Sequence, residues 1–465
     1  MEAFGHVIAT FRLPTASSTL ETARAAREAG ADRVEIRIDA LENLGQLGSL
    51  EPLVREMPLL VSGNRRILEC REKDPLRRLQ AAGAWVDIPF APDLPADLWG
   101  LDRSRLVLSF HDFEGTPDDL GARLHSIRAQ RPAVCKVVPT ARDFTDLLAV
   151  RDLLQGEGGH GDLCAFAMGT PGVASRAMAL AWGSCATYAS APGCDPAAPG
   201  QMDLRPLMEI YDPREVRGEE PLYAVTGWPL LSTGSPALHN RWLRALGLPG
   251  RFVPLPATRL SPVLEARESM MLRGLAVTSP HKEEAWSLAH HTSNLGRQLR
   301  ACNTLVPTKE GWFGANTDVF GVRCALAPVP GGTPALLLGA GGAAAAAAFV
   351  LARRGPLAIA ARDEAKATGL AGRFGASAVA WEERASIPCG LLVNATPCGQ
   401  ESEDCPFPVN ALGAGHVFDM VVREGGTPLL RAARERGAIA IPGQIMLKAQ
   451  ARLQFRLFTG LRPPR

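Results

Sequence analysis

The sequence predicts an α/β protein with an N-terminal (β/α)8 TIM barrel, a second α/β domain and a Rossmann dinucleotide-binding domain. Its 465 residues correspond to about three domains of ordinary size. Short β-rich runs alternate with helix-like stretches through the first part of the chain, as such a barrel requires. Later, the apolar run Leu336–Leu338 leads into a glycine turn and an alanine-rich stretch, the order of a dinucleotide-binding unit.

Eight β-rich runs predict the strands of the barrel, which we expect within residues 1–210. Helix-like segments separate the runs, so each strand can lie parallel to the next with a helix crossing outside. The runs are Val7–Phe11, Val34–Ile38, Leu59–Ser62, Trp85–Phe90, Leu106–Phe110, Val134–Val138, Leu163–Met168 and Thr187–Ser190.

The rest of the chain is predicted to form two domains and a terminal helix. Residues 211–221 are charged and punctuated by proline, which is typical of a linker. The second α/β domain is expected over residues 222–327 and the dinucleotide-binding domain over residues 328–444. Residues 445–465 are predicted to form the terminal helix.

The composition favours a small-molecule partner and gives no sign of nucleic acid or membrane binding. The chain has 50 Lys+Arg and 48 Asp+Glu, without a basic or acidic tract. Its ten cysteines are scattered and no histidine lies at zinc spacing, so we expect reduced thiols and no metal. The first strand begins so early that no signal peptide is expected, and the protein is predicted to be cytoplasmic. The uncharged stretch Ala335–Ala352 contains the glycine turn and is not expected to span a membrane.

The glycine turn is the candidate site for a pyrophosphate. Glycine lets the backbone approach the phosphates, which then lie on the amides and the positive dipole of the following helix. An alternative is that these small residues only pack a helix against a sheet. The candidate residues are Gly339, Ala340, Gly341, Gly342 and Ala343.

Five segments after the linker occur in a characteristic order: Tyr223–Pro229, Ser232–Asn240, Val277–Lys282, Asn316–Asp318 and Gly443–Gln450. Their residues and spacing resemble the shikimate dehydrogenase family, and the resemblance covers residues 222–460. It implies a substrate-binding domain, an NADP-binding Rossmann domain and a terminal helix that returns to the substrate domain.

The resemblance implies that the hydroxyls of Thr233 and Ser235 hold the carboxylate of shikimate. Ser232 stands where the family usually has His, and Thr233 where it usually has Ser, which keeps the hydroxyl. A helix cap near Pro236 is an alternative role for these hydroxyls and is compatible with binding. By the same resemblance, the ring hydroxyls of shikimate would contact Thr278, Asn303 and Gln450.

Lys282 and Asp318 are the candidate catalytic pair of this half. Reduction of a ketone by hydride leaves an alkoxide that must be protonated, so a lysine beside a carboxylate is the chemistry required. The resemblance implies that Lys282 donates the proton and that Asp318 holds and tunes it. A solvated surface charge is the ordinary alternative for either residue alone.

Arg362 is the residue expected to select the cofactor. An acid at the end of the second Rossmann strand binds a 2′-hydroxyl, whereas an arginine favours a 2′-phosphate. Arg362 matches the arginine of the family's Asn-Arg-Thr motif, although Ala361 and Asp363 replace its neighbours. NADP(H) is therefore the expected cofactor. Asn394 and Thr396 resemble the family's loop beside the nicotinamide, and they are equally typical of a turn that ends a strand.

Lys136 and His111 are the candidate catalytic residues of the barrel. Lys136 lies between apolar residues of the run Val134–Val138, so we expect it to point into the barrel, where burial lowers the pKa of its amine and frees it to attack a ketone. Protection of a sheet edge is the alternative. His111 ends a strand, where barrel enzymes place catalytic groups. The first 205 residues resemble type I 3-dehydroquinate dehydratase, whose Schiff-base lysine and general acid/base match these two residues.

Further barrel motifs provide candidate substrate ligands. Glu35, Arg37 and Asp39 alternate along one strand, so they share the face toward the barrel interior. By the resemblance, Arg176 pairs with the substrate carboxylate and Gln201 lies in the lid, where Ala198 replaces a serine of the family.

The loop after the third strand matches the family least well. The family has an arginine, then a glutamate four residues later that orients the histidine, then two glycines. Arg65 and Glu69 fit that spacing, but Cys70-Arg71 replaces the glycines. Arg71 with Asp74 is a competing register, and we prefer Arg65 and Glu69.

Together these features predict a bifunctional enzyme of the shikimate pathway. The first half would dehydrate 3-dehydroquinate to 3-dehydroshikimate through a Schiff base, and the second would reduce that product to shikimate with NADPH. Three alternatives remain: a dehydrogenase fused to an impaired dehydratase, quinate in place of shikimate, and a metabolite sensor without catalysis.

Overall fold

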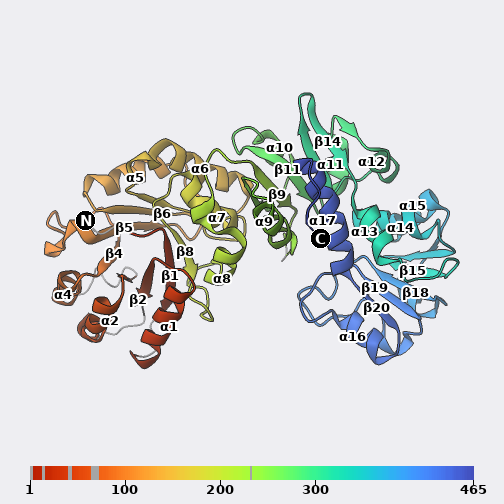
Figure 1. Cartoon of the computed structure of the whole chain (residues 1–465), viewed down its shortest axis with the longest axis horizontal. Coiled ribbons are helices and arrows are strands. Elements are labelled where there is room, and N and C mark those ends of the chain that lie inside the picture. Colours follow the sequence, from red (N-terminus) through yellow and green to blue (C-terminus); the bar gives the residue numbers. More distant parts are fainter. Residues whose placement is uncertain (1–3, 13–15, 40–43, 64–72, 231–232, 465) are drawn as a thin grey trace. The chain divides into compact units, whose positions relative to one another are not determined.

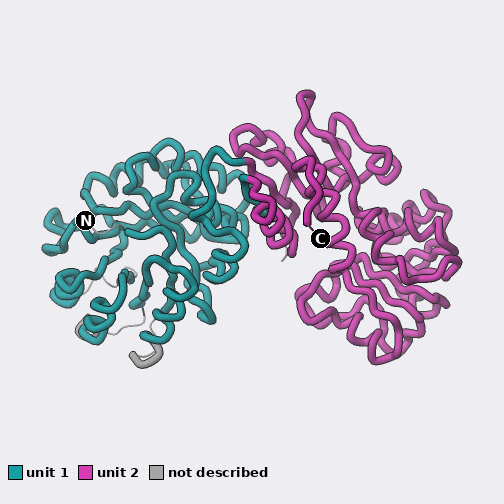
Figure 2. The backbone as a smooth tube through the Cα atoms, in the orientation of Figure 1, with its two compact units in different colours: residues 1–220, 249–256 teal, residues 221–248, 257–465 magenta. Residues whose placement is uncertain are grey.

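The computed structural model (Figure 1) describes residues 4–12, 16–39, 44–63, 73–230 and 233–464. Contacts divide the chain into two compact units, residues 1–220 with 249–256 and residues 221–248 with 257–465 (Figure 2). Within the described ranges, no helix combines the length and apolar character needed to cross a membrane. The nine cysteines in those ranges are free thiols.

The first unit contains eight parallel strands in the order β7-β6-β5-β4-β3-β2-β1-β8, which confirms the predicted (β/α)8 class. The strands are β1 (Val7–Arg12), β2 (Arg33–Arg37), β3 (Leu59–Ser62), β4 (Trp85–Pro89), β5 (Leu106–His111), β6 (Val134–Val138), β7 (Leu163–Ala165) and β8 (Thr187–Ser190). The helices are α1 (Ala16–Glu28), α2 (Glu51–Glu56), α4 (Asp74–Ala82), α5 (Leu120–Ala129), α6 (Phe144–Glu157), α7 (Val173–Trp182) and α8 (Leu204–Pro206).

The curled sheet brings β7 and β8 together. The amide of Cys185, just before β8, donates a hydrogen bond to the carbonyl of Leu163 on β7 at 2.7 Å. Alternate strand residues face inward, so Ile8, Trp85 and Tyr188 pack in one interior cluster. Polar side chains then occupy the carboxyl ends of the strands, where barrel enzymes place their sites.

The second unit begins with a mixed sheet in the order β10-β9-β11-β13-β14-β12. Its strands within the second unit are β9 (Leu222–Thr226), β11 (Leu272–Val277), β12 (His291–Thr292), β13 (Thr304–Thr308) and β14 (Gly311–Ala315). The edge strand β10 (Arg251–Pro254) lies in the segment 249–256, which contacts group with the first unit. The accompanying helices are α9 (Ser235–Ala245), α10 (Ser261–Glu265), α11 (Lys282–Leu288), α12 (Asn294–Leu299) and α13 (Asp318–Ala325). The terminal helix α17 (Gly443–Thr459) packs on α13 and α9, which brings it back to this sheet.

A parallel sheet in the order β17-β16-β15-β18-β19-β20 completes the unit. This is the doubly wound arrangement of a Rossmann domain, in which the crevice for ligands lies between β15 and β18, the point where the strand order reverses. The strands are β15 (Ala335–Leu338), β16 (Leu357–Ala360), β17 (Ser377–Val379), β18 (Leu391–Asn394), β19 (His416–Asp419) and β20 (Ile439–Pro442), and the helices are α14 (Gly342–Leu351), α15 (Glu364–Phe374) and α16 (Pro428–Glu435).

Candidate active sites

Lys136 is buried inside the barrel between two carboxylates. Its Nζ lies 3.0 Å from Asp87 Oδ2 and 3.4 Å from Glu35 Oε1, and the lysine side chain is only 3% exposed. The same nitrogen lies 4.0 Å from the centre of the Tyr188 ring, where the ring face adds a cation–π interaction. Because β6 pairs with β5 on one side and β7 on the other, Lys136 does not protect a sheet edge, and that alternative is wrong.

The expected direction of the Lys136 pKa is also wrong. Burial alone would lower it, but the negative charges of Asp87 and Glu35 outweigh burial and raise the pKa of Lys136. Burial would likewise raise the pKa of Glu35, yet Lys136, Arg37 and a hydrogen bond from Thr10 Oγ1 together lower it to about 2. Lys136 is therefore an ammonium held by carboxylates before substrate arrives.

His111 lies at the carboxyl end of β5 and is half-buried. Loss of solvent, with the positive charges of Lys136 and Arg37, lowers the pKa of His111 to about 3. The imidazole is therefore neutral near pH 7 and able to accept a proton. Its ring stacks on Phe113 at a centroid distance of 6.1 Å.

One pocket collects most of the barrel residues predicted from the sequence: Glu35, Arg37, His111, Lys136, Arg176 and Gln201. The guanidinium of Arg176 lies over the Phe166 ring and donates to the Tyr188 carbonyl at 3.1 Å. Its Nε is buried and has no hydrogen-bond partner among the described residues, so a donor remains for an acidic ligand. Arg37 Nε donates a hydrogen bond to Asp39 Oδ2 at 2.6 Å, whereas Glu35 on the same strand faces Lys136.

Arg65, Glu69 and Arg71 lie outside the described residues, so the choice between the two registers stays open. Asp74 begins α4, where it pairs with Arg77 of the same helix.

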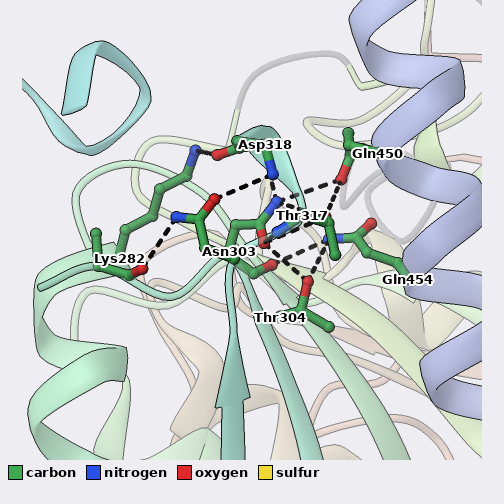
Figure 3. A network of polar contacts seen from close by, with 9 residues as sticks. Lys282, Asn303, Thr304, Thr317, Asp318, Gln450 and Gln454 are labelled. Carbon is green, nitrogen blue, oxygen red and sulfur yellow. Dashed lines mark hydrogen bonds and ion pairs between the residues drawn. The ribbon is translucent and has the colours of Figure 1, made fainter. Parts of the chain in front are cut away.

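Lys282 and Asp318 form an ion pair in the second unit. Lys282 Nζ lies 2.6 Å from Asp318 Oδ2, and the two side chains are 11% and 6% exposed (Figure 3). The other carboxylate oxygen accepts a hydrogen bond from Asn303 Nδ2 at 2.8 Å. Lys282 begins α11 and Asp318 begins α13, so two loop-to-helix junctions place the charges against each other.

Asn303 and Gln450 join this pair through a hydrogen-bonded network (Figure 3). Asn303 Nδ2 also contacts Gln450 Oε1 at 3.3 Å, and the Thr317 hydroxyl lies 3.1 Å from the same oxygen. One turn further along α17, Gln454 Nε2 donates to the Asn303 carbonyl at 3.0 Å. The terminal helix therefore fixes Asn303 beside the Lys282–Asp318 pair.

Thr233 and Ser235 lie at the start of α9. The Thr233 hydroxyl accepts from the Ser235 amide at 3.3 Å and donates to the Ser235 hydroxyl at 3.3 Å, whereas the N-cap residue of α9 is Gly234, without a side-chain cap. A Cβ at Gly234 would lie 3.1 Å from Leu447 Cδ2, which places this loop against α17 one turn before Gln450. Thr278 follows β11, and its amide donates to the Thr226 carbonyl.

Several residues of these sites were not singled out in the sequence analysis, three of which contact the candidate catalytic groups or their neighbours. Asp87 and Tyr188 face Lys136, and Gln454 supports Asn303. The four-residue spacing between Gln450 and Gln454 on one helix face was the available signal for Gln454. Asp87 and Tyr188 are single residues on predicted strands, and only the closed barrel brings them to the lysine.

The glycine turn lies at the crevice between β15 and β18. Gly339 has φ +109°, a conformation that glycine adopts readily, and a Cβ there would lie 3.2 Å from the Ala395 carbonyl. Around Gly341 no atom would lie within 4 Å of a Cβ, which leaves room for a phosphate at the N-terminus of α14. At Gly342 a Cβ would lie 3.0 Å from the Lys282 side chain, so the turn approaches the Lys282–Asp318 ion pair. Ala340 and Ala343 complete the turn.

The remaining cofactor candidates lie at the ends of neighbouring strands. Arg362 is exposed after β16, while Asp363 caps α15 through the Lys366 amide at 3.0 Å. Asp363 also lies 3.5 Å from Lys366 Nζ, so its negative charge is partly balanced beside Arg362. The side chain of Asn394 holds Thr396 through two hydrogen bonds.

Asp419 on β19 fixes Asn394 in turn. Its carboxylate accepts from Asn394 Nδ2 at 2.9 Å and from the Thr427 hydroxyl at 2.5 Å. Burial raises the pKa of Asp419 to about 6. A buried acid therefore organises the turn that follows β18.

Comparisons with known proteins support the family resemblance predicted for each half of the chain. Residues 7–217 match the family described as type I 3-dehydroquinase, and residues 225–305 match the shikimate dehydrogenase substrate binding domain. The bifunctional 3-dehydroquinate dehydratase/shikimate dehydrogenase of Arabidopsis thaliana, a chloroplastic protein, is 28% identical over 96% of this chain and 80% of its own length.

Two further matches each cover about half of this chain. The NADP(+) shikimate dehydrogenase of Anaeromyxobacter sp. (strain Fw109-5) is 37% identical, over 54% of this chain and 94% of that protein. The crystal structure of shikimate dehydrogenase 1 from Peptoclostridium difficile is 23% identical, with a TM-score of 0.50 over 53% of this chain and 94% of that chain, which supports the fold alone. The chain therefore belongs to the shikimate dehydrogenase family and carries a type I 3-dehydroquinase domain before that part.

Proposed function

We propose that the chain is a bifunctional enzyme that converts 3-dehydroquinate to 3-dehydroshikimate and then to shikimate. The observation that carries this proposal is that one chain holds a buried lysine between carboxylates and a separate lysine–aspartate pair beside a dinucleotide turn. The first arrangement suits imine chemistry, and the second suits protonation of a reduced ketone.

In the barrel, the Lys136 ammonium gives up two protons to the ketone oxygen of 3-dehydroquinate while its nitrogen bonds to the carbonyl carbon, so water leaves and a protonated imine forms. Neutral His111 takes a proton from the adjacent carbon and returns it to the leaving hydroxyl, which departs as water. Arg176 binds the carboxylate through its free Nε–H, and Glu35, Arg37 and Gln201 contact the rest of the substrate. Water then releases 3-dehydroshikimate and restores the lysine. Arg65 and Glu69 are predicted to support the substrate and His111.

In the second unit, Lys282 donates a proton to the oxygen of the ketone. Asp318 holds the Lys282 ammonium in place, and Asn303 Nδ2 in turn donates a hydrogen bond to the other oxygen of the Asp318 carboxylate. NADPH supplies the hydride when bound. Thr233 and Ser235 bind the carboxylate of the substrate, and Thr278, Asn303 and Gln450 bind its ring hydroxyls. Because Asn303 and Gln450 already bond to each other, substrate binding exchanges part of this network for ligand hydroxyls.

The glycine turn, Arg362 and the Asn394–Thr396 turn are proposed to hold NADP(H). Open space at Gly341 and the exposed guanidinium of Arg362 fit a pyrophosphate and a 2′-phosphate. The predicted domain limits, the cytoplasmic location and the absence of nucleic acid and membrane partners stay predictions.

Three alternatives are separated by direct assays. A sensor would bind both metabolites without turnover, but the retained proton-transfer groups Lys136, His111, Lys282 and Asp318 favour catalysis. An impaired dehydratase remains open because the unusual loop at Glu69–Arg71 lies outside the described residues. Turnover of shikimate and quinate, each with NADP and with NAD, distinguishes the two acids.

Borohydride trapping tests the dehydratase assignment. The chain is incubated with 3-dehydroquinate and borohydride, and the modified peptide is identified by mass spectrometry. We expect an adduct on Lys136 that is absent in Lys136→Met and retained in Lys282→Met, a matched control in the other site. Absence of an adduct from the wild-type chain would refute the imine mechanism.

A further inference from the structure

Asp87 is a buried carboxylate that the dehydration steps above do not use. It lies on β4 and is 2% exposed. Its Oδ2 is 3.0 Å from Lys136 Nζ, whereas its Oδ1 is buried and has no hydrogen-bond partner among the described residues. The Lys136 ammonium is thus the one group in the described ranges that compensates this charge by a hydrogen bond.

Glu35, the other carboxylate, is held more fully. Its Oε2 accepts from the Thr10 hydroxyl at 2.6 Å, and its Oε1 lies 3.4 Å from Lys136 Nζ, farther than Asp87. The positive charge of Arg37 interacts with both carboxylates, so the hydrogen bond from Thr10 is what distinguishes Glu35 from Asp87. Asp87 is therefore the closer and less compensated of the two partners of the lysine nitrogen.

We infer that Asp87 is the counter-ion that keeps the imine on Lys136 protonated during dehydration. This inference rests on the proposed dehydratase function. When the ammonium and the ketone combine, the Nζ–C bond forms, the C–O bond breaks and two ammonium protons leave on the water. The product is a protonated imine and water, so the positive charge stays on Nζ, the atom that Asp87 faces.

A protonated imine is the form that withdraws electrons when the adjacent carbon loses its proton. An imine nitrogen is a weaker base than an amine, and burial disfavours its charge further. A carboxylate in hydrogen-bond contact offsets both effects, because charge-assisted contacts are strong in a dry interior. The titratable groups that interact with Lys136 Nζ are Asp87, Glu35, Cys164, His111 and Tyr188, and the charged side chains of Arg37 and Arg176 line the same pocket.

The pH dependence of dehydration in full-length Asp87→Asn tests this role. With saturating 3-dehydroquinate, kcat is measured from about pH 6 to about pH 9, and borohydride trapping is timed over the same range. We expect the alkaline limb of kcat to move down by about one pH unit or more in Asp87→Asn. At pH values above the shifted limb, kcat and the trapping rate of Asp87→Asn should then be about tenfold lower than those of the wild type at the same pH. Asp87→Glu, which restores the charge, should recover most of this loss.

Controls separate this role from a structural one. Asp162→Asn removes a barrel carboxylate that pairs with Arg128 outside the pocket, and its profile should superimpose on the wild type. If Asp87→Asn lacks a cooperative melt, Asp87→Ser provides the same comparison with room for water. A folded variant with a lower kcat but an unshifted limb would overturn the counter-ion role. Absence of trapping in the wild type would instead refute the proposed function.

Discussion

The Lys282–Asp318 pair leads to a quantitative prediction for Asp318→Asn. Lys282 Nζ and Asp318 Oδ2 lie 2.6 Å apart, and both side chains are largely buried. The other oxygen of the Asp318 carboxylate accepts a hydrogen bond from Asn303 Nδ2. In the variant, the amide oxygen can still accept from Asn303, which leaves the amide NH2 facing the lysine ammonium. Two donors then oppose each other, so Lys282 must move away from the position in which it protonates substrate.

The expected loss follows from the strength of a hydrogen bond to a charged group. Such bonds contribute about 1.5–3 kcal/mol, and a tenfold change in rate corresponds to about 1.4 kcal/mol. We therefore expect kcat/KM for 3-dehydroshikimate to fall about 10-fold to about 150-fold, mainly through kcat. The KM for NADPH should change little.

Initial-rate measurements of NADPH oxidation with added 3-dehydroshikimate give these constants. Glu283→Gln removes an exposed acid from the same helix, α11, and should stay within about twofold of the wild type. A folded Asp318→Asn variant with unchanged kcat would refute the assigned role of the pair.

Three further predictions concern the second unit. Arg362→Ala should raise the KM for NADPH about 10-fold or more while leaving the KM for NADH unchanged, because only NADPH carries the 2′-phosphate; equal effects on both would contradict the assignment. Ser235→Ala should raise the KM for shikimate about fivefold or more with a smaller effect on kcat, and an unchanged KM would contradict a role of Ser235 in binding. The folded pKa of Asp419, about 6, exceeds its ordinary value of 3.8, so its contribution to the unfolding free energy is full below 3.8 and is lost as pH rises through 6. The melting temperature should therefore change less between about pH 5 and about pH 7 in Asp419→Asn than in the wild type. An equal change in both proteins would contradict the predicted contribution of Asp419 to stability.

The parts of both sites that lie close together in sequence could be predicted from it. Glu35, Arg37 and Asp39 share a face because strand side chains alternate, and the order of β15, the glycine turn and α14 follows from adjacent residues. Lys282 and Asp318, by contrast, lie 36 residues apart, and their pairing was expected from the resemblance to the shikimate dehydrogenase family.

What the sequence could not supply was the environment of each group. Burial of Lys136 was predictable from its apolar neighbours, but the direction of its pKa depends on two carboxylates from β2 and β4 that only barrel closure brings near. Asp87 carries no local motif, since its partner lies 49 residues away. The link from Thr427 through Asp419 to Asn394 is equally non-local, because it crosses from α16 to two strands.

The most direct test of the account supplies 3-dehydroquinate and NADPH to the purified full-length chain and follows product by NMR and NADPH by absorbance. We expect shikimate to form with one NADPH oxidised per molecule. Lys136→Met should oxidise NADPH only when 3-dehydroshikimate is supplied. Failure of the wild type to oxidise NADPH with 3-dehydroquinate, while it does so with 3-dehydroshikimate, would contradict the claim that both halves are active.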